Sequence, residues 1–255
     1  MKLPMRQDYG HGCYRRRIDV RVRPDRAVAE LEDDFHQFGV DVRFDGDRVR
    51  DISARSERFP WTTCPAASQA LEIFVGVELD TSLSALARLA EPDRQCTHQL
   101  DLACLAIASR ALGIEERRYD AAVPELSEGK TRVSLSIDGE TSLEWALQGM
   151  TIASPEPFSG RRLGGGFSAW VESEFSAEQA IEAHVLRRAT YIGFGRQYDF
   201  DAMPDPVEFA AATGSRCHSF HPSVIRDARR VVGSGRRYDD RPGELLRRSC
   251  VDRDF

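Results

Sequence analysis

The chain has 255 residues, of which 41% are hydrophobic, so it is long enough to enclose a substantial core. Its 35 lysines and arginines are outnumbered by 41 aspartates and glutamates, and the formal net charge of -6 argues against nucleic acid as a partner. The sequence shows no apolar run of membrane-spanning length, no secretory signal pattern and only six scattered cysteines, so we expect a cytoplasmic protein with reduced thiols and no membrane partner.

Strand patterns dominate the first part of the chain. Residues 14–59 alternate apolar and polar side chains, which predicts an antiparallel meander. Its clearest turn is Asp45-Gly46, because these residue types readily adopt the positive φ angles of a tight hairpin. Asp138-Gly139 predicts a second hairpin further along. Because helical sequence follows each hairpin, the pattern also hints at a duplicated half.

Helical periodicity is plainest in three segments. Ser176 and Gln179 form the capping box that predicts the start of the last of them. The middle segment is apolar nearly all round, so we expect it to be buried, with partners for its few polar groups. The three main helices are predicted at residues 65–75, 97–112 and 177–193.

Two segments carry the marks of irregular structure. Residues 151–166 contain two prolines and a glycine triplet, which predicts a long loop, either a mobile lid or a passive connector. The tail, residues 233–255, is rich in arginine and aspartate and is expected to be irregular and solvated. The sequence as a whole therefore predicts one compact α+β domain over residues 1–255, in which an antiparallel meander and hairpins pack with three main helices.

Reactive side chains gather where the middle helix begins, in residues 95–101. His98 and Asp101 are three residues apart, so both project from one helix face. The positive end of the helix dipole would lower the pKa of the Cys96 thiol and keep the imidazole neutral, and either effect suits catalysis. The alternative is structural: Thr97 caps the helix, the imidazole bonds a carbonyl and the thiol only fills space.

A carboxylate on an apolar face is the second anomaly. If residues 30–36 alternate as a strand, Asp33 points into the core together with Leu31 and Phe35. It is then either hydrogen-bonded for structural reasons or held at a raised pKa as a general acid or base. The opposite face is expected to form an acidic stripe that meets solvent, made of Glu32, Asp34 and His36.

Metal and cofactor signatures are weak. Cys64, Cys96 and His98, with His36 as a fourth ligand, would suit tetrahedral zinc. Their long spacing lacks the paired Cys-x-x-Cys of structural zinc sites, so the favoured interpretation includes no metal and no cofactor. The chain also lacks the glycine-rich nucleotide motifs and the Gly-x-Ser-x-Gly elbow of serine hydrolases.

Arginine and aromatic side chains supply candidate substrate contacts. Arg187, Arg188 and Tyr191 lie on a face of the last helix that is separate from its apolar stripe, where they could hold a planar phenolic or carboxylated ligand. A solvated helix face is the alternative. Trp61 and Cys64, in a run that precedes the first helix, complete this set.

Five motifs resemble those of a bacterial family known as domain of unknown function 2889. The resemblance runs across most of the chain and implies, loosely, a bacterial accessory or catabolic role in the breakdown of aromatic compounds. It implies no particular reaction. The motifs that carry it are residues 14–18, 30–36, 59–65, 95–98 and 216–220.

The leading hypothesis is a cofactor-independent lyase that acts on an aromatic, lignin-derived small molecule by acid–base proton transfer, such as retro-aldol loss of formaldehyde. Asp33, His98 and Asp101 would transfer protons, and Trp61 and Tyr191 would contact the ring. This hypothesis requires that Trp61 and His98 share one carbon-lined cavity. A non-catalytic protein that binds an aromatic or acyl-thioester ligand and a zinc enzyme with Cys and His ligands are the alternatives, and a homodimer is an open question.

Overall fold

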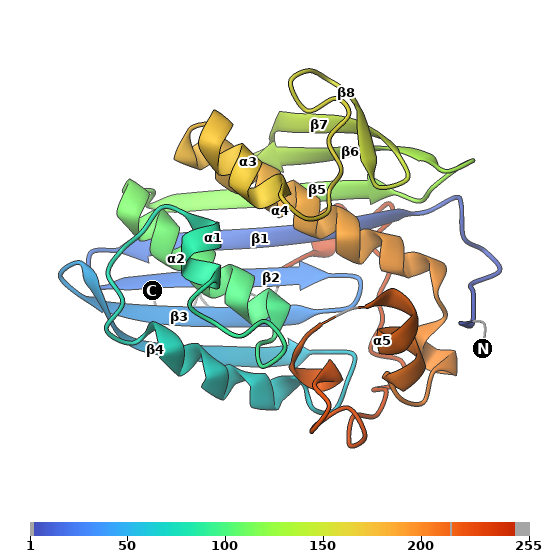
Figure 1. Cartoon of the computed structure of the whole chain (residues 1–255), viewed down its shortest axis with the longest axis horizontal. Helices are drawn as coiled ribbons and strands as arrows, with labels where there is room; N and C mark the ends of the chain where they lie inside the picture. The colour runs from blue at the N-terminus through green and yellow to red at the C-terminus, as the bar shows by residue number, and fades with distance from the viewer. Residues whose placement is uncertain (1–2, 215, 248–255) are drawn as a thin grey trace.

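One antiparallel sheet of eight strands forms the base of the molecule, in the order β4-β3-β2-β1-β5-β6-β7-β8 (Figure 1). The structure is a computed structural model that describes residues 3–214 and 216–247. The strands are β1 Cys13–Arg23, β2 Arg26–Asp33, β3 Gln37–Asp45, β4 Arg48–Arg58, β5 Glu116–Pro124, β6 Lys130–Ile137, β7 Glu140–Gln148 and β8 Thr151–Ser154.

The sheet consists of two four-stranded meanders that meet where β1 pairs with β5. A long helix follows each meander, α2 Thr97–Leu112 after the first and α4 Ala177–Gly193 after the second. α2 packs on β1, β2 and β3, and α4 packs on β5, β6 and β7. The two halves thus repeat one order of elements, which is the arrangement that a duplicated half requires.

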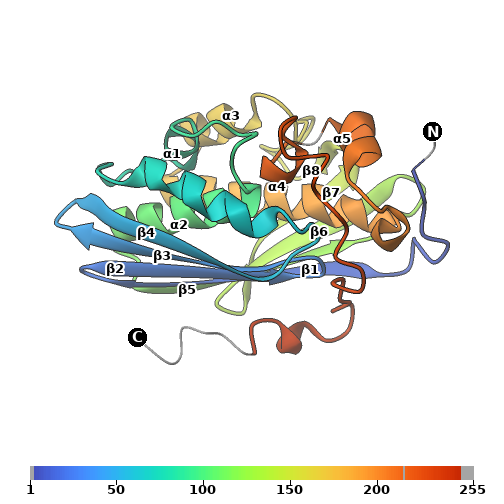
Figure 2. The ribbon, with the colours of Figure 1, turned by 90° about the horizontal axis from the view of Figure 1, so that it is seen from below.

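Except for the short 3-10 helix Pro242–Glu244 in the tail, the helices cover one face of the sheet, as the view along the sheet shows (Figure 2). This face is apolar because every second residue of each strand points to it, so Ile18, Val20 and Val22 of β1 are buried. None of the described residues form a helix that is long and apolar enough to cross a membrane. The other helical segments are η1 Cys64–Phe74, α1 Leu83–Ala87, α3 Phe167–Glu174, η2 Phe194–Gln197, η3 Phe200–Ala202, α5 Val207–Thr213, η4 His218–Phe220 and η5 Pro242–Glu244.

The α+β class and both hairpins are confirmed. Gly46 adopts a φ of 58°, and β3 pairs with β4 on either side of it. Asp138 and Gly139, with φ values of 51° and 92°, form the turn between β6 and β7. The capping box at Ser176 is also present, and the three predicted helices form where the sequence placed them, although the first is wound as a 3-10 helix.

The glycine-rich segment at 151–166 is packed against the domain. Its first residues form β8, which pairs with β7. Phe158 then stacks on Phe175, with ring centroids 5.0 Å apart, and contacts Trp145 and Trp170. Of the two interpretations of this segment, the mobile lid is therefore not supported by its contacts, since apolar packing of this kind fixes a loop in place.

The tail crosses the uncovered face of the sheet (Figure 2). Most of its described residues are exposed, as predicted, but Tyr238, Leu245 and Leu246 are buried there, so the solvated tail is wrong for these residues. The Tyr238 hydroxyl and the Leu246 N–H donate to Glu32 of β2, at 2.6 and 2.7 Å. Residues 248–255, which the same prediction included, lie outside the described residues.

Gly193, the last residue of α4, lies against the sheet at close range. A Cβ atom there would lie 3.0 Å from side-chain atoms of both Tyr14 and Val123. Gly193→Ala should therefore reduce the free energy of unfolding by about 1–3 kcal/mol, measured by chemical denaturation. Gly195→Ala is the matched control, because its Cβ would meet its nearest neighbour at 3.7 Å. Equal effects of the two substitutions would contradict this prediction.

Candidate functional site

The candidate site begins at the tight turn between β2 and β3. Asp33 ends β2, and its Oδ1 accepts hydrogen bonds from the backbone N–H groups of Phe35 and His36, each at 2.8 Å. The N–H of Asp33 in turn donates to the His36 carbonyl at 2.9 Å. An aspartate that bonds the backbone two and three residues ahead is a common way to fix a turn. These bonds set the position of His36.

Arg16 lies opposite Asp33 in the β1–β2 register. Its Nη2 donates to Asp33 Oδ2 at 2.7 Å, and its Nε donates to the Tyr14 hydroxyl at 2.8 Å. That hydroxyl donates to Asp33 Oδ2 at 2.7 Å, and all three side chains are buried. Burial alone would raise the pKa of Asp33, but His36, which is protonated in the acid range where Asp33 titrates, and Arg16 hold it well below its usual value by charge and hydrogen bonding. Asp33 is therefore ionised, and the predicted alternative of a raised pKa is wrong.

Two imidazoles stack beside this carboxylate. The ring centroids of His36 and His98 are 3.8 Å apart, at an interplanar angle of 30°. His36 Nδ1 lies 3.0 Å from Asp33 Oδ1, so with an ionised Asp33 the Nδ1 carries the hydrogen and Nε2 keeps a lone pair. The Nε2 of His98 is buried and has no hydrogen-bond partner.

Both imidazoles are neutral at neutral pH. Burial lowers the pKa of His36, although Asp33 opposes this change. Burial, His36 and Arg16 together hold the pKa of His98 well below its usual value. The prediction of a neutral imidazole at His98 is thus supported, with burial as the main cause. Because the rings touch, a proton on one disfavours a proton on the other.

Both histidines open on a cavity of about 350 Å³ between the β2–β3 turn, the start of α2, and α4 with the segments that follow it. Trp61 and His98 line this same cavity, as the leading hypothesis requires. We call it the aromatic cavity, after the rings in its lining, which are Phe35, Phe38, Trp61, Tyr191, Phe200, Phe209 and Phe220.

The thiols around this cavity are protonated. Cys96 is the N-cap of α2, yet burial raises its pKa, so the predicted activation by the helix dipole is wrong. Burial also raises the pKa of Cys64, whose Sγ lies 3.5 Å from the Ser219 hydroxyl. Desolvation outweighs the dipole here because the thiolate would lose its hydration. Neither thiol is set up as a nucleophile.

The predicted zinc ligands do not come together. Within 3–214 and 216–247, the only group of three or more candidate ligands whose donor atoms lie within 4.8 Å of one another is Asp33, His36 and His98. Cys64 and Cys96 are outside it. The Asp33 oxygens already accept from Arg16, Tyr14 and two backbone amides, and the guanidinium would repel a cation, so this group fits a metal poorly as well.

Asp101 lies apart from the histidines. It lines a neighbouring cavity of about 460 Å³, and its Oδ2 is 2.6 Å from Arg188 Nε. Arg187 lines that second cavity only, whereas Arg188 lines both. The structure therefore brings together His98, Trp61, Cys64, Tyr191 and Arg188 around the aromatic cavity and places Asp33 behind it.

The expected acidic stripe is absent from the surface. Glu32, Asp34 and His36 are all buried. Glu32 lies under the tail, and Asp34 forms an ion pair with Arg196, Oδ2 to Nη1, at 3.0 Å. The prediction of a solvent-exposed stripe is wrong because the strand ends at Asp33. The turn, and not strand alternation, therefore sets the directions of the Asp34 and His36 side chains.

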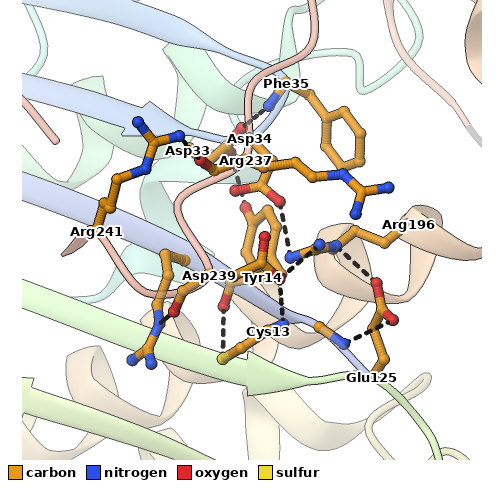
Figure 3. Close-up of polar contacts among 12 residues, drawn as sticks. Cys13, Tyr14, Asp33, Asp34, Phe35, Glu125, Arg196, Arg237, Asp239 and Arg241 are labelled. Carbon is orange, nitrogen blue, oxygen red and sulfur yellow. Dashed lines mark hydrogen bonds and ion pairs between the residues drawn. The ribbon is translucent and has the colours of Figure 1, made fainter. Parts of the chain in front are cut away.

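Arg196 binds three separate segments together (Figure 3). Its buried guanidinium contacts Asp34, Glu125 at 2.9 Å and Asp239 at 2.8 Å. Glu125 also accepts from the N–H of Gly10 at 2.7 Å. The β2–β3 turn, the end of β5 and the tail are thus fixed to one another behind the site.

Asp34 makes the stability of this arrangement depend on pH. Burial raises its pKa to about 7, against the opposing charge of Arg196 and with smaller contributions from Asp33 and Asp239. The folded state therefore binds a proton more tightly than the unfolded state, whose aspartate pKa is about 3.9, and stability falls as pH rises from about 4 to 7. Asp34→Asn should reduce this fall by about 2–4 kcal/mol, measured by denaturation across that range.

Asp239→Asn is the control for this prediction, because Asp239 has the same arginine partner but its pKa is shifted in the opposite direction. Hydrogen bonds from Cys13 and Arg196 outweigh burial and lower the pKa of Asp239, so its titration falls below about pH 4. Its substitution should change the slope between pH 4 and 7 far less than Asp34→Asn does, because Asp239 makes only a small contribution to the pKa of Asp34. If the stability of Asp34→Asn falls with pH as steeply as that of the wild type, Asp34 is not the group responsible for this pH dependence.

Comparison with known proteins finds similarity to one family over part of the chain and indicates no activity. Residues 15–110 match the family described as protein of unknown function DUF2889, which confirms the resemblance over β1 to α2. The match includes Arg16, Asp33, His36 and His98. No curated protein and no solved structure matches the chain.

Proposed function

We propose that this protein is a lyase that acts on an aromatic small molecule by acid–base proton transfer from its own side chains. One observation carries the proposal: the stacked His36 and His98, backed by the ionised Asp33, open on the aromatic cavity. A carboxylate, an imidazole and an apolar cavity are the elements of general acid–base catalysis at neutral pH. The aromatic substrate, the cytoplasmic location and a homodimer stay predictions.

Ring side chains support an aromatic substrate. Trp61, Phe38 and Phe220 offer flat apolar surfaces that stack on a planar ligand. Arg188 lines the same cavity beside them, as does Arg216, and Arg188 forms an ion pair with Asp101. It can stabilise a phenolate or enolate oxygen through a charge-assisted hydrogen bond.

The reaction that fits best is a retro-aldol loss of formaldehyde. The substrate carries a hydroxymethyl group on a carbon that is attached to an electron-accepting group, and this electron acceptor is conjugated with the aromatic ring. His36 Nε2 takes the hydroxyl proton, the carbon–carbon bond breaks, and its electron pair moves into the acceptor while formaldehyde leaves. The imidazolium is stabilised by Asp33 and then returns the proton to carbon. Atoms and charges balance without an oxidant, so the reaction needs no redox carrier.

Roles follow from these contacts. His36 is the catalytic base, and His98, whose Nε2 is unpartnered, is placed to hold the acceptor oxygen or relay the proton. Asp33 is a positioning residue because it acts through His36. Asp101 takes no part, since it lines the neighbouring cavity.

Formaldehyde release tests the proposal. Purified wild-type protein should release one formaldehyde per product from aromatic compounds that carry such a hydroxymethyl group, with or without a metal chelator. Cys64→Ala should retain this activity, because its thiol is protonated and takes no part in the steps above. Saturable binding of these compounds without turnover would instead identify a ligand-binding protein, and loss of turnover with the chelator would identify a metal enzyme.

A further inference from the structure

The second cavity, of about 460 Å³, carries an unusual charge for an acidic protein. It lies between α1, α2 and α4 and over β1 and β2. Its only acidic lining residue is Asp101, against four arginines, and we call it the arginine cavity. The arginines are Arg16, Arg88, Arg187 and Arg188.

Two of these arginines already have carboxylate partners. Arg16 pairs with Asp33 at 2.7 Å, and Arg188 pairs with Asp101 at 2.6 Å. Among the described residues, no carboxylate forms an ion pair with Arg88 or Arg187. Arg88 is exposed and donates to the Ser84 hydroxyl at 3.0 Å, whereas Arg187 is half-buried. The Arg187 Nε donates to the Leu163 carbonyl at 2.6 Å, a neutral partner that forms no ion pair with it.

Arg187 is also half-buried and held in place. Its guanidinium lies 5.2 Å from the ring centroid of Tyr191 and 5.8 Å from that of Phe167. Burial and the neighbouring Arg188 lower its pKa, while Tyr191 and Asp101 partly oppose this change. A rigid cation that is partly desolvated and unpaired is a preformed site for an anion.

The remaining walls of the cavity are mostly apolar, apart from Ser84, Ser168 and His184. The apolar walls suit a hydrocarbon body better than a phosphate, whose three oxygens would need several donors. These wall residues include Ile18, Leu31, Leu83, Leu105 and Val185.

We propose that the arginine cavity binds the carboxylate of an organic acid with an apolar body, and that Arg187 is its main anchor. The planar guanidinium matches the two oxygens of a carboxylate, and the walls bury the hydrocarbon part. This inference does not rest on the proposed lyase reaction, which uses His36 and His98 in the other cavity.

Calorimetric titration of the whole chain tests this site. The probes are a series of saturated cyclic and aromatic carboxylates of increasing size, each with its uncharged carboxamide. We expect a carboxylate to bind and its carboxamide to bind far more weakly. Arg187→Met keeps the apolar stem and should weaken carboxylate binding by about 10- to 100-fold without affecting the carboxamide. Arg187→Lys keeps the charge but loses the planar pair of N–H donors, so it should reduce carboxylate affinity by an intermediate amount. This variant also tests the site if Arg187→Met does not fold.

Controls separate this cavity from other sources of binding. Arg161→Met should bind like wild type, because Arg161 also lies over a ring, that of Trp170 at 4.2 Å, but outside the cavity. Trp61→Leu should also leave the affinity unchanged. The proposal is overturned if no carboxylate of the series binds, if Arg187 variants bind like wild type, or if Trp61→Leu is the variant that loses binding. Displacement of the acid by inorganic phosphate, with the same dependence on Arg187, would assign the site to phosphate instead.

Discussion

Asp33→Asn should lower the free energy of unfolding by about 3–5 kcal/mol. The substitution keeps the shape of the side chain but removes its charge, and Arg16 is then left buried without a counter-ion. Removing one partner of a buried ion pair is costly because the other cannot regain its hydration. Equilibrium denaturation in urea at neutral pH measures the effect.

Glu144→Gln is the matched control for this prediction. Glu144 also pairs across neighbouring strands, with Arg132 at 2.6 Å, but both side chains are exposed, so its loss should cost at most about 1 kcal/mol. The double variant Arg16→Met with Asp33→Asn should recover more than half of the lost stability, since it removes the unpaired charge while the asparagine oxygen can still accept from the turn amides. If Asp33→Asn and Glu144→Gln lower the free energy of unfolding equally, burial of Arg16 without a counter-ion does not carry the predicted cost.

Local chemistry explains why much of the fold could be predicted. The Asp138-Gly139 turn requires positive φ angles, and the helix that begins at Ser176 requires a cap, so a few residues settle each feature. Strand alternation likewise placed Asp33 on the core face with Leu31. The sheet order could not be predicted, because the pairing of β1 with β5 joins segments about a hundred residues apart, and no local pattern records it.

The site was predicted only in part for the same reason. His98 and Trp61 were found by residue type near helix starts, and they do share a cavity. Arg16 and Tyr14 were missed, although a signal was present: they fall in the same alternation as Ile18 and so place a guanidinium and a hydroxyl on the apolar face of β1. A second buried charge close to Asp33 would have indicated an ion pair rather than a carboxylate of raised pKa.

His36 shows a further limit of pattern reasoning. Alternation assigned it to solvent, but the turn after Asp33 redirects it toward His98. Whether a residue follows the strand or the turn depends on where the strand ends, and a shift of one residue reverses its face. The zinc alternative did group His36 with His98, but the alternation could not predict that the two rings stack on each other.

His98→Ala and His36→Gln should each lower kcat for formaldehyde release by about 10²- to 10⁴-fold, the usual contribution of a general acid or base. The base must be neutral to accept a proton. Because burial holds the pKa of His36 below its ordinary value of 6.5, kcat/KM should stay constant from neutral pH down to about 6.5 and fall only in more acidic solution. The pH profile of the wild type and the single-variant rates measure both effects.

His221→Ala supplies the control, because His221 lines neither the aromatic cavity nor the arginine cavity. It should retain the wild-type rate. A merely structural role for the histidines would change stability and leave the rate of the folded protein near that of the wild type, so denaturation curves must accompany the kinetics. If folded His98→Ala or His36→Gln retains more than about a tenth of kcat, the stacked imidazoles do not transfer the proton, since a true acid–base group contributes at least a hundredfold.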